Sequence, residues 1–423
     1  MSPQKQPLNV AIVGAGLAGL SAAIALRRNG FIVQIYESEE CKTEIGAGLG
    51  VPVNAQRVLE GLGYSKENLK GVVNEGVLQL DANGGTGEVI PWLLESLNNT
   101  SSKPNILCHR SDLHAELERL ALGPGEGPPA VLHLSSKVLE CDPEAGALTL
   151  SDGRVVHSDL ILGADGISSS VRTDILGHKV RPILTGGSCY RAVIEASKLE
   201  GREGLAWLNE GISGPRMVIK SEGPAIRMVA IYPCRSGTLL NIVAGFADPH
   251  QTDPDWTATG TRADVQALFA DFHAQYQPVF DALPDQVLKW RFLTLPHLPT
   301  WVRGRAALVG DAAHGTLPRL GQGAALAIED AAALGALLPP GTTPAEVPAR
   351  LAAYEALRKP RGEFVVRESV MGPNKAKWYP KRDGEQDPVV AGSPKEQQAY
   401  LMEYDVTKVA AEYYAEKFGR KEV

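Results

Sequence analysis

The chain has 423 residues, 44% of them hydrophobic, and a formal net charge of −7 at pH 7. This length suffices for two or three domains with sizeable buried cores. Because lysine and arginine are scattered rather than clustered, the sequence lacks the basic patch of a nucleic-acid-binding protein, and we expect no such partner.

The cysteines and the longest apolar run both indicate a cytoplasmic protein. No CxxC motif and no histidine pair at metal-ligand spacing occur, so we expect reduced thiols and no metal site. The uncharged run from Val10 to Leu26 is short for a membrane span and is interrupted by glycines, so we expect neither a span nor a signal peptide. The cysteines are Cys41, Cys108, Cys141, Cys189 and Cys234.

A nucleotide-binding motif comes first along the chain. NVAIVGAGLAGL predicts a buried strand, a glycine turn and a helix that ends at Gly30, and FIVQIYE predicts the next strand of a parallel sheet. Gly14, Gly16 and Gly19 form a GxGxxG motif, which lets a pyrophosphate approach the helix N-terminus. Glu37 ends the second strand and can accept hydrogen bonds from a ribose. The motif alone does not distinguish NAD from FAD, and its alternative is a glycine-rich packing joint.

Three further segments after the nucleotide-binding motif predict strands, a helix and turns. Residues 105–120 predict a short strand and an amphipathic helix, with Arg110 at the junction. LTLSDGRVV predicts a hairpin, because Asp-Gly separates two alternating apolar runs. DLILGADG predicts a buried strand that ends in a turn at Asp165 and Gly166. Such an Asp-Gly pair is also typical of an ordinary strand-ending turn.

The pattern of predicted elements changes in the middle of the chain. Between about Ser188 and Phe246 the runs SCYRAVI, PRMVIKS, IRMVAIY and LLNIVAGF predict an inserted antiparallel sheet. RAALVGDAAH then restores the parallel pattern, and Ala324 to Leu338 predicts a buried helix. After Pro339 we expect helical stretches that are broken by Pro344, Pro348 and Pro360.

The sequence resembles the single-component (class A) FAD-dependent aromatic hydroxylases, especially the salicylate hydroxylase-like branch, at GAGLAG, GADGISSSVR and GDAAHGTLPRLGQG. The resemblance covers residues 10–338 and is weakest in the tail. It implies an α/β fold: a Rossmann-like FAD-binding domain with an inserted, mostly antiparallel β-sheet substrate domain and a C-terminal helical segment. The expected divisions are 1–75, 103–180 and 285–338 for the FAD-binding domain, 76–102 and 181–284 for the substrate-binding domain, and 339–423 for the C-terminal helical region.

The resemblance also implies residue roles. Glu37 would hold the adenosine ribose, Arg110 would contact the flavin end, and Asp165 would lie near the pyrophosphate. Asp311 would bind the ribityl chain, and Pro318, counted with the catalytic residues, would lie beside the reactive edge of the flavin. The helix that starts after the last glycines would present main-chain N–H groups to the ring and stabilise negative charge there. The expected cofactor-binding residues are Gly14, Gly16, Gly19, Glu37, Arg110, Asp165, Gly166, Asp311, Gly321 and Gly323.

The implied activity is that of an FAD-dependent monooxygenase, which uses NAD(P)H and O2 to hydroxylate a phenolic or other electron-rich aromatic small molecule through a flavin hydroperoxide. GAGLG at 46–50 offers no histidine for attachment, so FAD should be noncovalent. No second GxGxxG follows a strand, so NADPH or NADH should dock transiently to a monomer or homodimer. The alternatives are epoxidation or dearomatising hydroxylation of an alkene, indole or polyketide, an FAD oxidase or dehydrogenase without oxygen insertion, and a noncatalytic flavin-binding partner protein.

Candidate substrate residues lie in the inserted sheet and the last glycine-rich loop. Arg191 matches a position where related enzymes often place an arginine toward a phenolate or carboxylate, and its alternative is an ion-paired strand residue. Tyr232 could bond the substrate hydroxyl or pack in the core, and Tyr190 should point away from Arg191. Arg319 departs from the family pattern and could attract an anion or pair with an acid. His314 could act as a base, or serve as a cap or packing residue.

Overall fold

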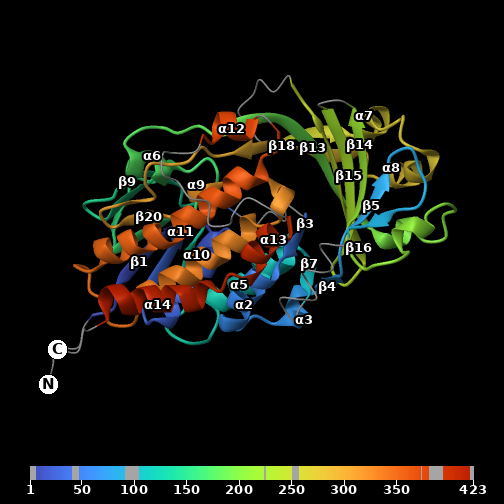
Figure 1. Cartoon of the computed structure of the whole chain (residues 1–423). Helices are drawn as coiled ribbons and strands as arrows, with labels where there is room; N and C mark the ends of the chain where they lie inside the picture. The colour runs from blue at the N-terminus through green and yellow to red at the C-terminus, as the bar shows by residue number, and fades with distance from the viewer. Residues whose placement is uncertain are drawn as a thin grey trace.

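The predicted βαβ unit forms the centre of a six-stranded sheet (Figure 1). Strand β1 (Asn9–Val13) pairs in parallel with β2 (Ile32–Tyr36) on one side and β12 (Leu160–Gly163) on the other, and helix α1 (Leu17–Arg28) connects β1 to β2. The sheet is completed by β8 (Val131–His133), β20 (Ala306–Leu308) and the antiparallel edge strand β19 (Val302–Arg303). The computed structural model describes residues 6–40, 47–90, 104–222, 225–249, 257–372, 374–380 and 394–419.

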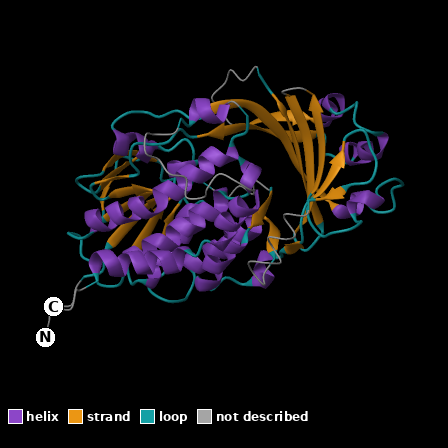
Figure 2. Ribbon diagram, viewed as in Figure 1, coloured by secondary structure: helices purple, strands orange, loops and turns teal. Residues whose placement is uncertain are grey.

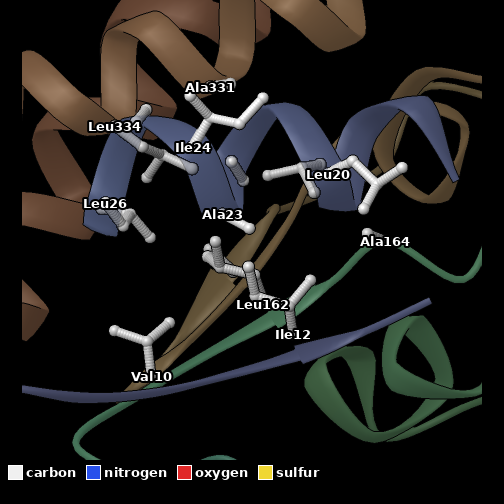
Figure 3. Packing of buried hydrophobic residues seen from close by; sticks show 14 of the residues in the cluster. Val10, Ile12, Leu20, Ala23, Ile24, Leu26, Leu162, Ala164, Ala331 and Leu334 are labelled. Carbon is white, nitrogen blue, oxygen red and sulfur yellow. The ribbon is translucent and has the colours of Figure 1, made fainter. Parts of the chain in front are cut away.

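Helix α1 lies between this sheet and helix α10 (Gly323–Leu337), as Figure 3 shows. Val10 and Ile12 of β1 face the helix, whose Leu20 and Ile24 are almost completely buried. Small residues bring the two helices close together, since a Cβ added at Gly335 would lie 3.2 Å from the Ala25 Cβ. Full burial of a leucine or isoleucine side chain stabilises the fold by roughly 1.5–3 kcal/mol. Most side chains of α10 are buried, so the predicted buried helix from Ala324 to Leu338 is confirmed.

The remaining elements around the six-stranded sheet include two small antiparallel sheets. The Asp-Gly hairpin is confirmed, because β10 (Ala147–Leu150) pairs with β11 (Val155–His157) and also with β9 (Val138–Asp142). In the other small sheet, β7 (Asn105–His109) lies between β3 (Gly48–Val51) and β4 (Val72–Asn74). The helices here are α2 (Val53–Gly61), α3 (Lys66–Leu69), α5 (Arg110–Leu122), α6 (Ser170–Leu176), α9 (Asp311–His314) and the 3-10 turn η4 (Pro318–Leu320).

The predicted antiparallel sheet is present as an eight-stranded sheet in the order β17-β18-β13-β16-β15-β14-β5-β6. Figure 2 shows its curved strands at one end of the molecule, away from most of the helices. Only its β14·β5 pair is parallel among the strands described. Its strands are β5 (Leu78–Asp81), β6 (Glu88–Val89), β13 (Ile183–Glu195), β14 (Arg216–Glu222), β15 (Ala225–Cys234), β16 (Leu239–Ala247), β17 (Thr257–Thr261) and β18 (Gln286–Thr294).

Short helices cover this sheet with a second hydrophobic core. Phe269, Phe272, Tyr276 and Phe280 are almost fully buried there, and Trp207 meets Tyr276 edge to face with ring centroids 5.1 Å apart. Aromatic side chains of this kind bury large apolar areas. The short helices are α7 (Arg262–Leu268), α8 (Gln277–Asp281), η1 (Ala196–Leu199), η2 (Ala206–Leu208) and η3 (Ala274–Tyr276).

The tail forms helices α11 (Val347–Ser369), α12 (Asn374–Trp378), α13 (Pro394–Glu403) and α14 (Val406–Phe418). The prediction that Pro360 breaks a helix was wrong, because α11 continues through it. Proline costs one main-chain hydrogen bond, but Arg358 and Arg361 on either side of it form buried ion pairs that hold the helix in place. Pro348 lies in the first turn, where proline is tolerated.

Three expected absences concern the described ranges alone. Within them no helix has the length and apolarity to cross a membrane. The same ranges contain no group of three or more histidine, cysteine or acidic side chains that could hold a metal ion. Cys108, Cys141, Cys189 and Cys234 are free, buried thiols, and Cys41 lies outside the described residues.

Candidate active site

The first glycine motif forms a close joint between sheet and helix. Gly14 has a φ of +101°, and a Cβ added there would lie 2.6 Å from the Ala164 carbonyl oxygen. A Cβ on Gly19 would lie 2.0 Å from the Gly14 carbonyl oxygen, so the helix start approaches the turn directly. Gly16, by contrast, faces open space, and no side chain caps the N-terminus of α1. The joint therefore leaves free the helix end at which a phosphate binds.

Glu37 closes this loop from the neighbouring strand. Its Oε2 accepts a hydrogen bond from the Ala15 N–H (2.8 Å), and its Oε1 accepts from the Ser38 hydroxyl (3.0 Å) and the Glu39 N–H (3.1 Å). A carboxylate has about four acceptor positions, so one remains for a further donor such as a ribose hydroxyl.

Asp165 and Gly166 form the turn after β12. The Asp165 Oδ2 accepts from the Ser170 N–H (2.8 Å) and the Ser170 hydroxyl (3.1 Å), so this carboxylate supports the start of α6 as an ordinary turn residue does. Its Oδ1 is buried without a hydrogen-bond partner, and Gly166 has a φ of +73°. The local turn alternative therefore accounts for one carboxylate oxygen, and the other remains available to a ligand.

The stretch from Gly310 to Gly323 folds into a loop between β20 and α10. Asp311 begins α9 and is exposed, yet desolvation by the surrounding protein raises the pKa of its carboxyl; the charges of His314 and Arg110 oppose this rise. Arg110, the first residue of α5, is within electrostatic range of both Asp311 and Arg191.

The end of this loop leads into helix α10. Gly321 has a φ of +63° and Gly323 begins α10, whose N-terminus has no capping side chain and no acidic residue in its first turn. Pro318 is exposed and begins η4. The loop therefore presents an uncapped helix N-terminus beside exposed residues, an arrangement that favours negative charge on a ligand.

Arg191 and Tyr232 meet at one main-chain carbonyl. The Tyr232 hydroxyl donates to the Gly48 oxygen (2.8 Å), and the Arg191 Nη2 donates to the same oxygen (3.3 Å). Burial raises the pKa of Tyr232 to about 12, with Arg191 opposing the rise. The Arg191 guanidinium also lies 4.3 Å from the centre of the Trp290 ring. As predicted from strand alternation, Tyr190 points elsewhere and stacks on Phe246.

Two further residues of this region were missed from the sequence. Asn241, fully buried, accepts the Gly48 N–H through its Oδ1 (2.7 Å), and it lies opposite Tyr232 in the β15·β16 pair. A Cβ on Gly48 would come within 2.5 Å of the Tyr232 ring and 2.7 Å of the Asn241 Cβ. Because Arg191, Tyr232 and Asn241 all hold the Gly48 peptide, we call this group the Gly48 contact. These residues are far apart in the sequence, so no local sequence pattern predicts the contact.

His314 and Arg319 have partners within the protein. The His314 Nε2 lies 2.7 Å from the Asp330 Oδ2, and both side chains are almost completely buried. This placement matches the packing alternative and leaves His314 without access to a substrate. Arg319 bonds to the main-chain carbonyls of Glu368 and Ser369 at the end of α11, where a cation is favoured by the helix dipole.

The residues of the loops fit FAD. The open space at Gly16 and the uncapped start of α1 suit a pyrophosphate, and the remaining acceptor position of Glu37 suits a ribose hydroxyl. The partnerless Asp165 Oδ1 and the exposed Asp311 carboxylate supply acceptors for cofactor hydroxyls. Fold and site together are those of a flavoprotein with a separate antiparallel sheet.

Comparison with known proteins makes the family definite. Residues 7–369 match the family model described as FAD binding domain, and the chain belongs to this family. It is similar to the hispidin-3-hydroxylase of Neonothopanus nambi, with 40% identity over 385 residues, 87% of this chain and 89% of the relative. It is also similar to the FAD-dependent monooxygenase cfoG of Aspergillus candidus, with 33% identity over 379 residues, 86% and 85% of the two chains.

A solved structure supports the fold at the level of the whole chain. The salicylate hydroxylase substrate complex matches with a TM-score of 0.71 and 24% identity, over 97% of this chain and 98% of that one. The predicted class A hydroxylase fold is confirmed. The chain is an FAD-dependent monooxygenase.

Proposed function

We propose that this chain hydroxylates a phenolic or other electron-rich aromatic small molecule with O2 and NAD(P)H. The observation that carries the proposal is that the neighbouring carbonyls of Ala47 and Gly48 accept hydrogen bonds from the Arg110 N–H and from Arg191 of the large sheet. Arg110 also lies within electrostatic range of Asp311, which is on the loop of residues 310–323 that we call the flavin loop. A substrate held by the sheet would thereby lie next to the cofactor. The names of two similar proteins, hispidin-3-hydroxylase and salicylate hydroxylase, support the same substrate class.

In this proposal the loops hold the cofactor and exclude water from it. Bound FAD supplies the redox chemistry, because it accepts electrons from NAD(P)H and passes them to O2. Glu37 binds the adenosine ribose, Asp165 and Gly166 lie near the pyrophosphate, and Asp311 binds the ribityl hydroxyls. The main-chain N–H groups at the start of α10 stabilise negative charge on the ring. Gly14, Gly16, Gly19, Arg110, Gly321 and Gly323 complete the proposed cofactor site.

Arg191 and Tyr232 would orient the aromatic ring by its oxygen substituent. The Tyr232 hydroxyl donates a hydrogen bond to the Gly48 carbonyl oxygen, so its own oxygen is left to accept a hydrogen bond from a substrate O–H. With a pKa of about 12 this hydroxyl keeps its proton near neutral pH. The permanently charged guanidinium of Arg191 stabilises negative charge on the same substrate oxygen. Pro318 would border the ring from the flavin loop.

The proposal extends to organisation and location. We assign residues 1–75, 103–180 and 285–338 to FAD binding, 76–102 and 181–284 to the substrate, and 339–423 to the tail, except that 286–294 go with the large sheet because β18 lies in it. FAD is held noncovalently and NADPH or NADH docks transiently. We propose a cytoplasmic monomer or homodimer, in keeping with the free thiols of the described cysteines.

Oxygen incorporation tests the proposal. Purified holoenzyme is given NADPH or NADH with hispidin, salicylate or related phenols under labelled O2, and both peroxide and product are measured. We expect the substrate to accelerate NAD(P)H consumption and one labelled oxygen atom to enter the ring. Peroxide equal to the NAD(P)H consumed, without incorporation for any aromatic, would instead identify an oxidase. Label in an epoxide or a dearomatised product would favour the related alternative.

A further inference from the structure

Helix α11 contacts the flavin loop, residues 310–323, at α9 and at η4. In Figure 1 it runs beside α9, which lies in the loop, and α10, which follows the loop. It belongs to the tail, in which the family motifs give no role to any residue. The contacts between α11 and the loop therefore raise the question of what the tail does for the cofactor.

The first contact runs through Asp330 of α10. Its Oδ2 accepts the Gly310 N–H (3.0 Å) and lies 2.7 Å from the His314 Nε2, so one carboxylate oxygen holds the residue before α9 and the last residue of α9, on either side of Asp311. Its Oδ1 accepts from the Arg358 Nε on α11 (2.9 Å). All of these side chains are almost completely buried. Asp330 thus connects the Asp311 turn to the tail helix.

The connection is rigid because its charges are paired and surrounded. Arg358 also bonds Glu329 (2.8 Å), and Arg361 forms a two-point pair with Glu329 (2.8 Å each). Two carboxylates and two guanidinium groups therefore balance in the interior. Burial alone would raise the pKa of Asp330, but the nearby His314 and Arg358 outweigh it and lower that pKa. Separating one partner from a buried ion pair would leave an uncompensated charge, which strongly destabilises the fold. The paired arrangement of these four side chains is therefore strongly favoured.

The second contact lies at the other end of the loop. Arg319 donates to the Glu368 and Ser369 carbonyls at the end of α11, and the Leu317 N–H donates to the Ser369 hydroxyl (3.3 Å). Between the two contacts, α11 approaches the loop closely at Gly362, where a Cβ would lie 3.4 Å from the His314 Cβ. Helix α11 thus contacts the loop directly near His314 and at Leu317 and Arg319, and it is connected to Gly310 through Asp330.

We propose that Asp330 and Arg319 are positioning residues for FAD, through which tail helix α11 fixes the loop that carries Asp311 and the start of α10. Neither residue touches the cofactor in this proposal. Asp330 holds the Gly310 main chain before Asp311 and the His314 side chain after it, and Arg319 sets the turn that leads into α10. The tail is then part of the FAD site, and FAD affinity depends on residues of α11 that lie outside every glycine motif.

Reconstitution with FAD tests the proposal in the full chain. Apoprotein is titrated with FAD, its dissociation constant is measured, and the visible circular dichroism of the bound flavin and the melting temperature of the apoprotein are recorded. We expect Asp330→Asn to raise the dissociation constant about tenfold or more, because a charged hydrogen bond is lost. Arg319→Gln should raise it about threefold to tenfold and alter the flavin dichroism, whereas Arg319→Lys, which can still donate to the carbonyls, should restore most of the affinity.

The control is Lys359→Gln, which removes an ion pair with Glu363 on α11 that makes no contact with the loop in the bonds described. It should leave FAD affinity and dichroism as in the wild type. Arg319 is exposed, so its variants keep the test decisive if Asp330→Asn does not fold. Wild-type FAD affinity and dichroism in Arg319→Gln, together with wild-type affinity in any folded Asp330→Asn protein, would overturn the proposal.

Discussion

Arg191, for which we propose a substrate role, is held by the Gly48 contact and by Trp290. Its guanidinium reaches the Gly48 oxygen and lies over Trp290, while its Nε is buried without a partner. It is therefore held in position before any substrate arrives. A group that is preorganised in this way loses little freedom when it meets an anionic oxygen.

Replacement of Arg191 tests this role. We expect Arg191→Gln to lower substrate-stimulated turnover on the order of tenfold to a hundredfold, since a charged hydrogen bond contributes roughly 1.5–3 kcal/mol. FAD should remain bound, because the residue belongs to the large sheet rather than to the glycine loops. Steady-state kinetics and the flavin absorbance of the purified variant measure the two effects. Unaltered kinetics would remove Arg191 from the substrate site.

In the proposed function, Asp311 has opposite effects on stability and on cofactor binding. Desolvation raises the pKa of its carboxyl in the folded protein, so folding favours the protonated form. Stability is therefore gained as pH falls through the raised pKa, and near neutral pH the ionised group costs stability. The effect is small, because water still reaches the side chain.

Asp311→Asn separates the two contributions. Near neutral pH we expect the apoprotein of this variant to melt at an equal or slightly higher temperature than the wild type, because the desolvated charge is gone. Its FAD affinity should fall at the same time, since an ionised acceptor for the ribityl hydroxyls is lost. Melting curves of the apoprotein and FAD titration measure these changes. Unchanged FAD affinity would contradict the role of Asp311.

At the scale of elements, strand β3 links the large sheet to the flavin side. The Gly48 N–H donates to Asn241, and the Gly48 carbonyl accepts from Tyr232 and Arg191. The Ala47 carbonyl next to it accepts from the Arg110 N–H (2.8 Å). One short strand therefore positions residues of both parts. A side chain at Gly48 has no room, because the Tyr232 ring and Asn241 occupy it.

Gly48→Ala should displace strand β3 from the large sheet. The added methyl group would force β3 away from the large sheet, and overpacking of this kind destabilises proteins by roughly 1–3 kcal/mol. We also expect a higher KM for the aromatic substrate, because Arg191 and Tyr232 lose their shared acceptor. Gly50→Ala in the same strand is the matched control, since nothing lies within 4 Å of its added Cβ. Equal thermal stability and KM in the two variants would count against the Gly48 contact.

The elements that could be predicted from the sequence are those with a local cause. GxGxxG and its flanking apolar runs specify β1, α1 and β2, because turn, helix start and buried strands all lie within one continuous segment. The Gly48 contact joins residues separated by 143, 184 and 193 positions, so no pattern within a window reveals it. The Asp330 contact did leave a signal, since Glu329 and Asp330 interrupt an otherwise apolar helix. The continuity of α11 through Pro360 depends on tertiary ion pairs, and local propensity therefore failed.

At the scale of the molecule, FAD would join segments that the chain keeps far apart. Residues 14–37, 110, 165–166 and 311–323 come from different parts of the sequence and surround one proposed cofactor site. A ligand that binds only the folded state stabilises it in proportion to the logarithm of its free concentration. FAD should therefore stabilise the whole sheet-and-helix assembly rather than one loop.

The dependence of melting temperature on FAD tests this integration. At a free FAD concentration of about 100 times its dissociation constant, we expect about 2.7 kcal/mol of added stability and a clear rise in melting temperature. In Asp311→Asn the same rise in melting temperature should require a higher FAD concentration, because the affinity is lower. When FAD is in large excess over its dissociation constant, each tenfold increase in free FAD should add the same stability as in the wild type. Hydrogen exchange should slow together at residues 14–19 and 311–323, since both segments contact the same ligand. Slower exchange at only one of these segments would mean that FAD does not bridge them. A melting temperature that does not change with FAD concentration would mean that FAD does not bind the folded chain.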